Sequence, residues 1–177
     1  MADHGTLIRN QGGAAAAELA LVTPMLLILM FGSVELGNYF MNEHALVKQV
    51  RDGARYASRL PLTASYSCDP ATVTSAAETQ VIDVTKTGQV GVSATTPKRM
   101  PFKAGDGACG KEGATVTVTV RCVDKDLYPG LWRGYDGDIP VVKVAGKVAY
   151  RPAWAPIGFQ SANLCLRAES EMPVIGL

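Results

Sequence analysis

The feature that most constrains this chain is an apolar run near its start. Residues 19–34 contain no charged side chain, and the alanines at 14–17 extend the run backwards with one interruption, Glu18. A helix needs about 20 residues to cross the hydrocarbon core of a bilayer. We therefore predict one membrane-spanning helix that carries a carboxylate just inside its first turn.

Glu18 needs a compensating group, because a charged side chain at mid-bilayer costs roughly 3 kcal/mol on insertion scales and less near the interface. If the chain were cut after Gly13, Ala14 would carry a new α-amino group and Glu18 would become the fifth residue. The ammonium group of one subunit could then neutralise the carboxylate of its neighbour in a packed array of helices. The alternative is a Glu18 that is protonated or that snorkels to the interface.

The order of these residues resembles a known family. The segment GGAAAAELALVTPMLLILMFGSVELGNYF, followed by ALVKQVRDGARYASR, is similar to the TadE-like family, the pseudopilins or minor pilins of the tight-adherence (Tad) pilus system. The resemblance covers residues 11–60 and rests on Gly13, Glu18, Pro24 and the RDGARYA motif. It departs at Leu19, where family members often have an aromatic residue.

The resemblance implies a structural and assembly role rather than an enzymatic one. Residues 1–13 would be a leader, cut between Gly13 and Ala14 by a prepilin peptidase, and the mature protein would prime or support assembly of the major pilin. The implied partners are the inner membrane, the peptidase and other pilin or pseudopilin subunits. The alternative is an uncleaved single-pass envelope protein whose C-terminal domain is a binding module. A Sec-type signal peptide is disfavoured, because residues 31–35 offer only a poor cleavage site.

Charge and cysteine content bear on the partners of the domain that follows the helix and on the side of the membrane where it lies. Lys plus Arg is 17 and Asp plus Glu is 16, which gives no basis for a nucleic-acid partner. All four cysteines follow the run, which favours an oxidising compartment and two disulfides over four unrelated buried thiols. They are Cys68, Cys109, Cys122 and Cys165. The positive-inside rule is ambiguous here, so the cysteines decide the orientation: N-terminus cytoplasmic, C-terminal domain periplasmic or, after incorporation, in the extracellular pilus.

The cysteine pairing stays open at this stage, because four cysteines allow three connectivities. Cys122 falls on the apolar face of its predicted strand and Cys165 on the polar face of another. If both strands are regular, this difference argues against a direct bond between these two residues.

Apolar positions at helical spacing continue the helix through residues 38–59, where Pro61 stops it. A rod of about 45 residues would be roughly 65–70 Å long, and Pro24 predicts a kink or a loosened turn within it. In the RDGARYA motif, Arg51 and Arg55 lie one turn apart. They either face solvent or pair with acidic groups of a neighbouring subunit or of the C-terminal domain.

The remaining chain predicts an α+β fold, with residues 1–13 as leader, 14–60 as helix and 61–177 as domain. Residues 61–70 are expected to be a linker and residues 71–87 a second helix that ends at Gly88. Alternating residues predict a mostly antiparallel sheet of about four strands at 89–95, 116–122, 140–150 and 163–172.

No catalytic, cofactor or metal site is predicted. The chain has no Cys-x-x-Cys pair, and His44 has no second histidine at ligand spacing. The G-x-G-x-x-G match at 105–110 lacks the strand and helix that a dinucleotide site requires. Two loops rich in aromatic residues and proline, around Trp132 and Trp154, are either contact surfaces or caps on a small core, and the cap is the favoured interpretation.

Overall fold

The structure is a computed structural model that describes residues 12–93, 95, 99, 101–102, 109, 114–127, 130, 132, 135–157 and 164–176. The predictions for the leader (residues 1–11), and for the glycine-rich loop at 105–110 apart from Cys109, lie outside the described residues.

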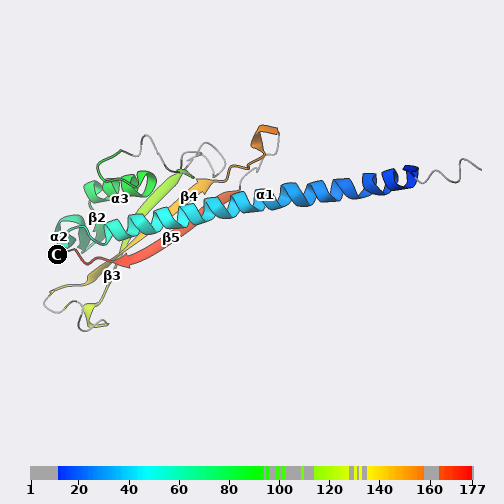
Figure 1. Ribbon diagram of the computed structural model, residues 1–177. Coiled ribbons are helices and arrows are strands. Elements are labelled where there is room, and N and C mark those ends of the chain that lie inside the picture. The colour runs from blue at the N-terminus through cyan, green and yellow to red at the C-terminus, as the bar shows by residue number, and fades with distance from the viewer. Residues whose placement is uncertain are drawn as a thin grey trace, which may run out of the picture.

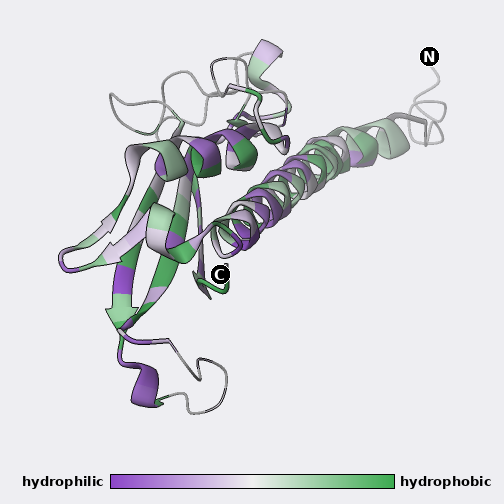
Figure 2. Ribbon diagram, turned by 90° about the vertical axis from the view of Figure 1, so that its left-hand side faces the viewer, coloured by the Kyte–Doolittle hydropathy of each residue, from purple (hydrophilic) through white to green (hydrophobic). Residues whose placement is uncertain are grey.

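Helix α1 (Gly12–Ala57) contains 46 residues and confirms the predicted long helix. Its N-terminal half projects away from the rest of the protein, and its C-terminal half lies along the sheet (Figure 1). Figure 2 shows mostly hydrophobic colours in the projecting half and mixed colours in the half beside the domain. The apolar and amphipathic halves inferred from the sequence thus belong to one continuous helix.

Pro24 lies inside α1. Figure 1 shows the helix without a sharp bend, so of the two expected alternatives the kink is not seen, and the loosened turn stays a prediction. Near the proline, the Thr23 hydroxyl donates a hydrogen bond of 2.6 Å to the Leu19 carbonyl oxygen.

The domain combines short helices with two antiparallel sheets, which confirms the α+β class. Its elements in order are α2 (Leu62–Ser65), β1 (Tyr66–Cys68), β2 (Ala71–Val73), α3 (Ser75–Thr87), β3 (Thr115–Val123), the 3-10 helix η2 (Lys125–Leu127), β4 (Ile139–Ala149), the 3-10 helix η3 (Ala155–Ile157) and β5 (Cys165–Pro173). Strands β1 and β2 form a hairpin, and the larger sheet has the order β3-β4-β5. Five strands in two sheets are described, where about four were expected.

Helices α1 and α3 cover one face of the larger sheet, and the core lies between these two layers. Alternation along β3 buries Val116 and Val118 as predicted, because every second side chain points to the same face of a strand. The buried side chains that join the helices to the sheet are Leu46, Val50, Ala54, Val81, Val118, Val142, Val144, Val148 and Leu166. Gly146 on β4 permits the close approach of α1, since a Cβ atom there would lie 2.8 Å from Val50.

Three local predictions were wrong. Residues 61–70 are not a linker, because they contain α2 and β1. The second helix begins at Ser75 rather than at residue 71, because residues 71–73 pair with residues 66–68. No strand forms in the described part of 89–95, where Gly88 and Gly91 adopt left-handed φ angles of 72° and 76° and turn the chain.

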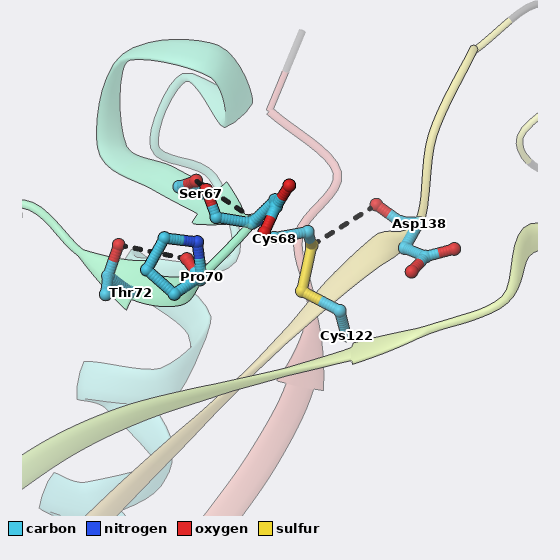
Figure 3. The surroundings of a disulfide bond; sticks show 7 residues. Ser67, Cys68, Pro70, Thr72, Cys122 and Asp138 are labelled. Carbon is cyan, nitrogen blue, oxygen red and sulfur yellow. Dashed lines mark hydrogen bonds between the residues drawn. A yellow bond between two sulfur atoms is a disulfide. The ribbon is translucent and has the colours of Figure 1, made fainter.

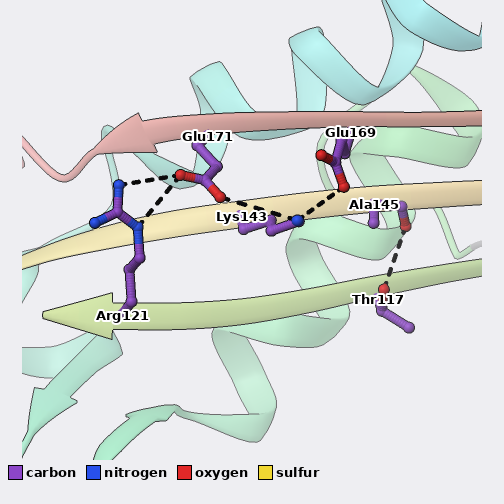
Figure 4. A network of polar contacts seen from close by, with 6 residues as sticks. All are labelled: Thr117, Arg121, Lys143, Ala145, Glu169 and Glu171. Carbon is purple, nitrogen blue, oxygen red and sulfur yellow. Dashed lines mark hydrogen bonds and ion pairs between the residues drawn. The ribbon is translucent and has the colours of Figure 1, made fainter.

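The opposite face of the larger sheet is polar and exposed (Figure 4). Lys143 on β4 donates a hydrogen bond of 2.7 Å to Glu169, which raises the pKa of Lys143. Arg121 on β3 contacts Glu171 at 3.1 Å. These pairs join all three strands, and surface pairs of this kind contribute little to stability.

The C-terminal segment returns to the far end of α1. The backbone N–H of Ile175 donates to the Ser58 carbonyl oxygen at 2.7 Å, and that of Val174 donates to the Pro140 carbonyl oxygen at 2.9 Å. These bonds hold the described end of the chain at the tip of the domain that is farthest from the projecting half of α1 (Figure 1).

Candidate assembly site

The projecting half of α1 carries the sequence-predicted assembly residues. It is the one helix among the described residues that is long and apolar enough to cross a membrane. Its large side chains face outward: Leu19 is 66% exposed and Ile28 is 71% exposed. An apolar surface of this length in an isolated chain requires a partner, either lipid or other helices.

Gly13 and Glu18 lie in the first two turns of this exposed surface. Glu18 has no hydrogen bond and no ion pair with any residue that the structure describes. A Cβ atom built on Gly13 would meet nothing within 4 Å. The chain itself therefore supplies no described partner for the carboxylate, and nothing described crowds the Gly13–Ala14 bond.

The RDGARYA motif divides into two faces. Gly53, Ala54 and Ala57 are buried against the domain. Arg51 and Arg55 are exposed, and neither forms an ion pair with an acidic group within the described ranges. Pairing of these arginines with the chain's own described domain is therefore not observed, and pairing with a neighbouring subunit remains a prediction. Ala54 and Ala57 belong to the apolar positions at helical spacing that predicted the helix, and with Gly53 they are the part of the motif that packs.

Gly53 lies where α1 packs closely against α3. A Cβ atom at this position would overlap Thr85, which is fully buried in α3. We expect Gly53→Val to lower the free energy of unfolding by about 1–3 kcal/mol, as overpacking of a core does. Urea unfolding in detergent would measure the change.

Gly37 provides the matched control on the same helix. A Cβ atom there meets nothing within 4 Å, so Gly37→Val should change the stability by less than about 1 kcal/mol. Equal effects of the two substitutions would contradict the packing of α1 on α3.

A second polar cluster, which we call the clasp, joins the middle of α1 to the end of β4. The Tyr150 hydroxyl donates to Oε1 of Glu35 at 2.5 Å, and the backbone N–H of Ala153 donates to Oε2 at 3.0 Å. Asn38 Nδ2 donates to the Tyr150 oxygen at 2.9 Å and to the Arg151 carbonyl oxygen at 3.3 Å. Both carboxylate oxygens of Glu35 therefore accept hydrogen bonds from the domain.

Burial of Tyr150, together with its hydrogen bond to Glu35, raises the pKa of the Tyr150 hydroxyl from 10.0 to about 12. A raised pKa in the folded state means that folding favours the neutral phenol. The stability that Tyr150 contributes is therefore complete below pH 10 and is lost as the pH rises towards 12. At neutral pH the hydroxyl remains a hydrogen-bond donor to Glu35.

The aromatic residues of the two proline-rich loops have different positions. Trp132 packs against the buried core, as the favoured interpretation predicted. Trp154 instead meets Phe31 of α1 edge-to-face, with ring centroids 4.9 Å apart. Its indole nitrogen is shielded and has no hydrogen-bond partner among the described residues.

The four cysteines form two bonds, Cys68–Cys122 and Cys109–Cys165, and none of them is free. The first bond ties the β1–β2 hairpin to β3, and Cys68 also lies 3.5 Å from the Asp138 carbonyl oxygen (Figure 3). The second ties Cys109 to the start of β5. Cys122 and Cys165 are not joined to each other, in agreement with the difference between their strand faces.

These features define a class of protein in which one exposed apolar helix, able to span a membrane, carries a small disulfide-bonded domain on its other half. Residues 13–55 match the family model described as TadE-like protein. No curated protein and no solved structure matches the chain. The family match lies wholly within α1, so the likeness concerns the helix with Gly13, Glu18 and the RDGARYA motif.

Proposed function

We propose that this chain is a pseudopilin, a minor structural component of a Tad pilus. The observation that carries the proposal is the TadE-like match over residues 13–55, which coincides with an exposed apolar helix. A structural subunit needs no catalytic constellation, and its chemistry is the packing of one helix against lipid and against the helices of neighbouring subunits.

In this proposal residues 1–13 are a leader, residues 14–60 carry the helix and residues 61–177 form the exported domain. The chain inserts in the inner membrane with its N-terminus in the cytoplasm, and a prepilin peptidase cuts between Gly13 and Ala14. Two observations support the cut: the residues on either side of that bond are exposed, and Glu18 lacks a described partner in its own chain. Arg51 and Arg55, exposed on the other half of α1, are then available to acidic groups of a neighbouring subunit.

N-terminal sequencing of protein extracted from membranes tests the proposal. The mature chain should begin Ala-Ala-Ala-Ala-Glu, because the peptidase removes everything up to Gly13. Gly13→Val should block the cut and leave membrane insertion intact, since it adds only an apolar side chain to the helix. Gly32→Val is the matched control, because a Cβ atom there also meets nothing within 4 Å and the residue lies far from the cut.

A mature N-terminus upstream of Gly13 or beyond Val34 would contradict the pseudopilin assignment. An N-terminus upstream of Gly13 in a protein that remains in the membrane would favour an uncleaved anchor with a binding domain. An N-terminus beyond Val34 would favour a secretory signal peptide.

A further inference from the structure

Residues 150–157, the segment that follows β4 and that we call the connection, leave the sheet and reach along α1 towards its apolar half (Figure 1). The connection contacts α1 at Phe31, Glu35 and Asn38. These three positions lie on either side of Val34, the last residue of the uncharged run. The connection is therefore level with the point where α1 changes from apolar to charged.

We propose that this connection rests on the lipid headgroup layer of the membrane that α1 crosses, with Trp154 at the boundary between headgroups and acyl chains. The proposal rests on the membrane anchorage in the proposed function. Phe31 precedes Val34 by three residues, about 4.5 Å along a helix. Trp154 packs on Phe31 and so lies just inside the end of the run. Tryptophan side chains are enriched at this depth of a membrane.

The clasp gives Glu35 the hydrogen bonds that a carboxylate needs where there is little water. A carboxylate that loses its hydration needs hydrogen-bond donors from the protein. The Tyr150 hydroxyl and the Ala153 N–H supply one donor to each oxygen of Glu35. Glu35 is the first charged residue after the run. Its carboxylate is therefore hydrogen-bonded by the domain at the position where α1 leaves the apolar layer.

The outer surface of the connection suits a lipid rather than a protein. Residues 150–157 contain no acidic side chain. Arg151, Ala153 and Pro156 are exposed. Leu164, whose carbonyl oxygen accepts from the Tyr150 N–H, is 42% exposed. A basic residue beside small apolar ones matches an anionic headgroup layer over acyl chains.

Fluorescence quenching in vesicles tests the proposal. The full chain is reconstituted in vesicles of phosphatidylcholine and phosphatidylglycerol, with quenchers attached either near the headgroup or deep in the acyl chain. Trp132→Phe leaves Trp154 as the only tryptophan, and the matched variant Trp154→Phe leaves Trp132. We expect shallow quenchers to reduce Trp154 emission several-fold more than deep ones. Trp132, which is partly buried against the core of the domain, should respond to aqueous acrylamide but to neither lipid quencher.

Each outcome decides a different point. Flotation of the protein with the vesicles while Trp154 is quenched no more than Trp132 would overturn the lipid contact but not the anchorage. Shielding of Trp154 from both lipid and aqueous quenchers would show that protein, either its own chain or a second copy, covers the ring, which also overturns the proposal. Failure to float would overturn the anchorage and this inference together. If Trp132→Phe misfolds, the difference between wild type and Trp154→Phe still gives the Trp154 signal.

Discussion

Replacing Glu18 by alanine should leave the protein inserted in the membrane and correctly cut, but recovery of other pilus subunits with it should fall. The carboxylate is exposed on the apolar half of α1 and has no described partner in its own chain. If the Ala14 ammonium of a neighbour neutralises it, the substitution removes an attraction between subunits. Loss of about 1.4 kcal/mol per contact lowers each association constant roughly tenfold, so piliation should fall by at least that factor.

The alternative for Glu18 predicts the opposite result. A protonated or snorkelling carboxylate only adds to the cost of insertion, so Glu18→Ala would then insert at least as well, and its function would survive. Glu43→Ala is a matched control, because it removes a carboxylate from the same helix beyond the apolar run. Normal processing, normal partner recovery and normal pili in a Glu18→Ala strain would leave intersubunit pairing without support.

Removal of the Cys68–Cys122 bond should cause one of the two largest losses of stability in the domain. The bonded residues are 54 positions apart, and the loop-entropy model gives about 4 kcal/mol for a loop of that length. A small domain has a total stability of only about 5–15 kcal/mol. The double variant Cys68→Ser/Cys122→Ser should therefore unfold at a much lower urea concentration, and it leaves no unpaired thiol to complicate the measurement.

The second bond offers a comparison of nearly equal loop length, since Cys109 and Cys165 are 56 positions apart. Its double serine variant should lose a similar free energy of unfolding. Alkylation of unreduced protein from the envelope, followed by mass measurement, should detect no free thiol. Two or more free thiols would contradict both the pairing and the oxidising compartment.

The long helix and the principal strands were predictable because each has a strong period. The apolar run, and apolar residues such as Leu46 and Val50 at helical spacing, predicted the helix. Alternation of apolar and polar residues in β3 predicted a strand with Val116 and Val118 on its buried face. The β1–β2 hairpin was missed because its two strands have only three residues each. Such short strands show no recognisable alternation.

The candidate site was predictable only where its signal was local. Gly13 and Glu18 are five positions apart in the sequence, so counting could relate them. The clasp joins residues that are 112–118 positions apart, and no spacing rule connects Glu35 to Tyr150 or Ala153. An acidic residue at the end of an apolar run, and a loop rich in aromatic residues and proline, were visible separately. Their contact depends on the packing of α1 along the sheet.

Neither disulfide includes a residue of α1, and this determines how the domain would transmit a mechanical force. When the projecting half of the helix is pulled, the backbone passes the force to the rest of the chain only after Ala57, the last residue of α1. From there the covalent path runs through α2 and β1 to Cys68 and crosses to β3 at Cys122. Without that bond, the covalent path to β3 would run through α3 and the whole segment before Thr115. The bond thus shortens the route by which extraction from the membrane would pull on the sheet.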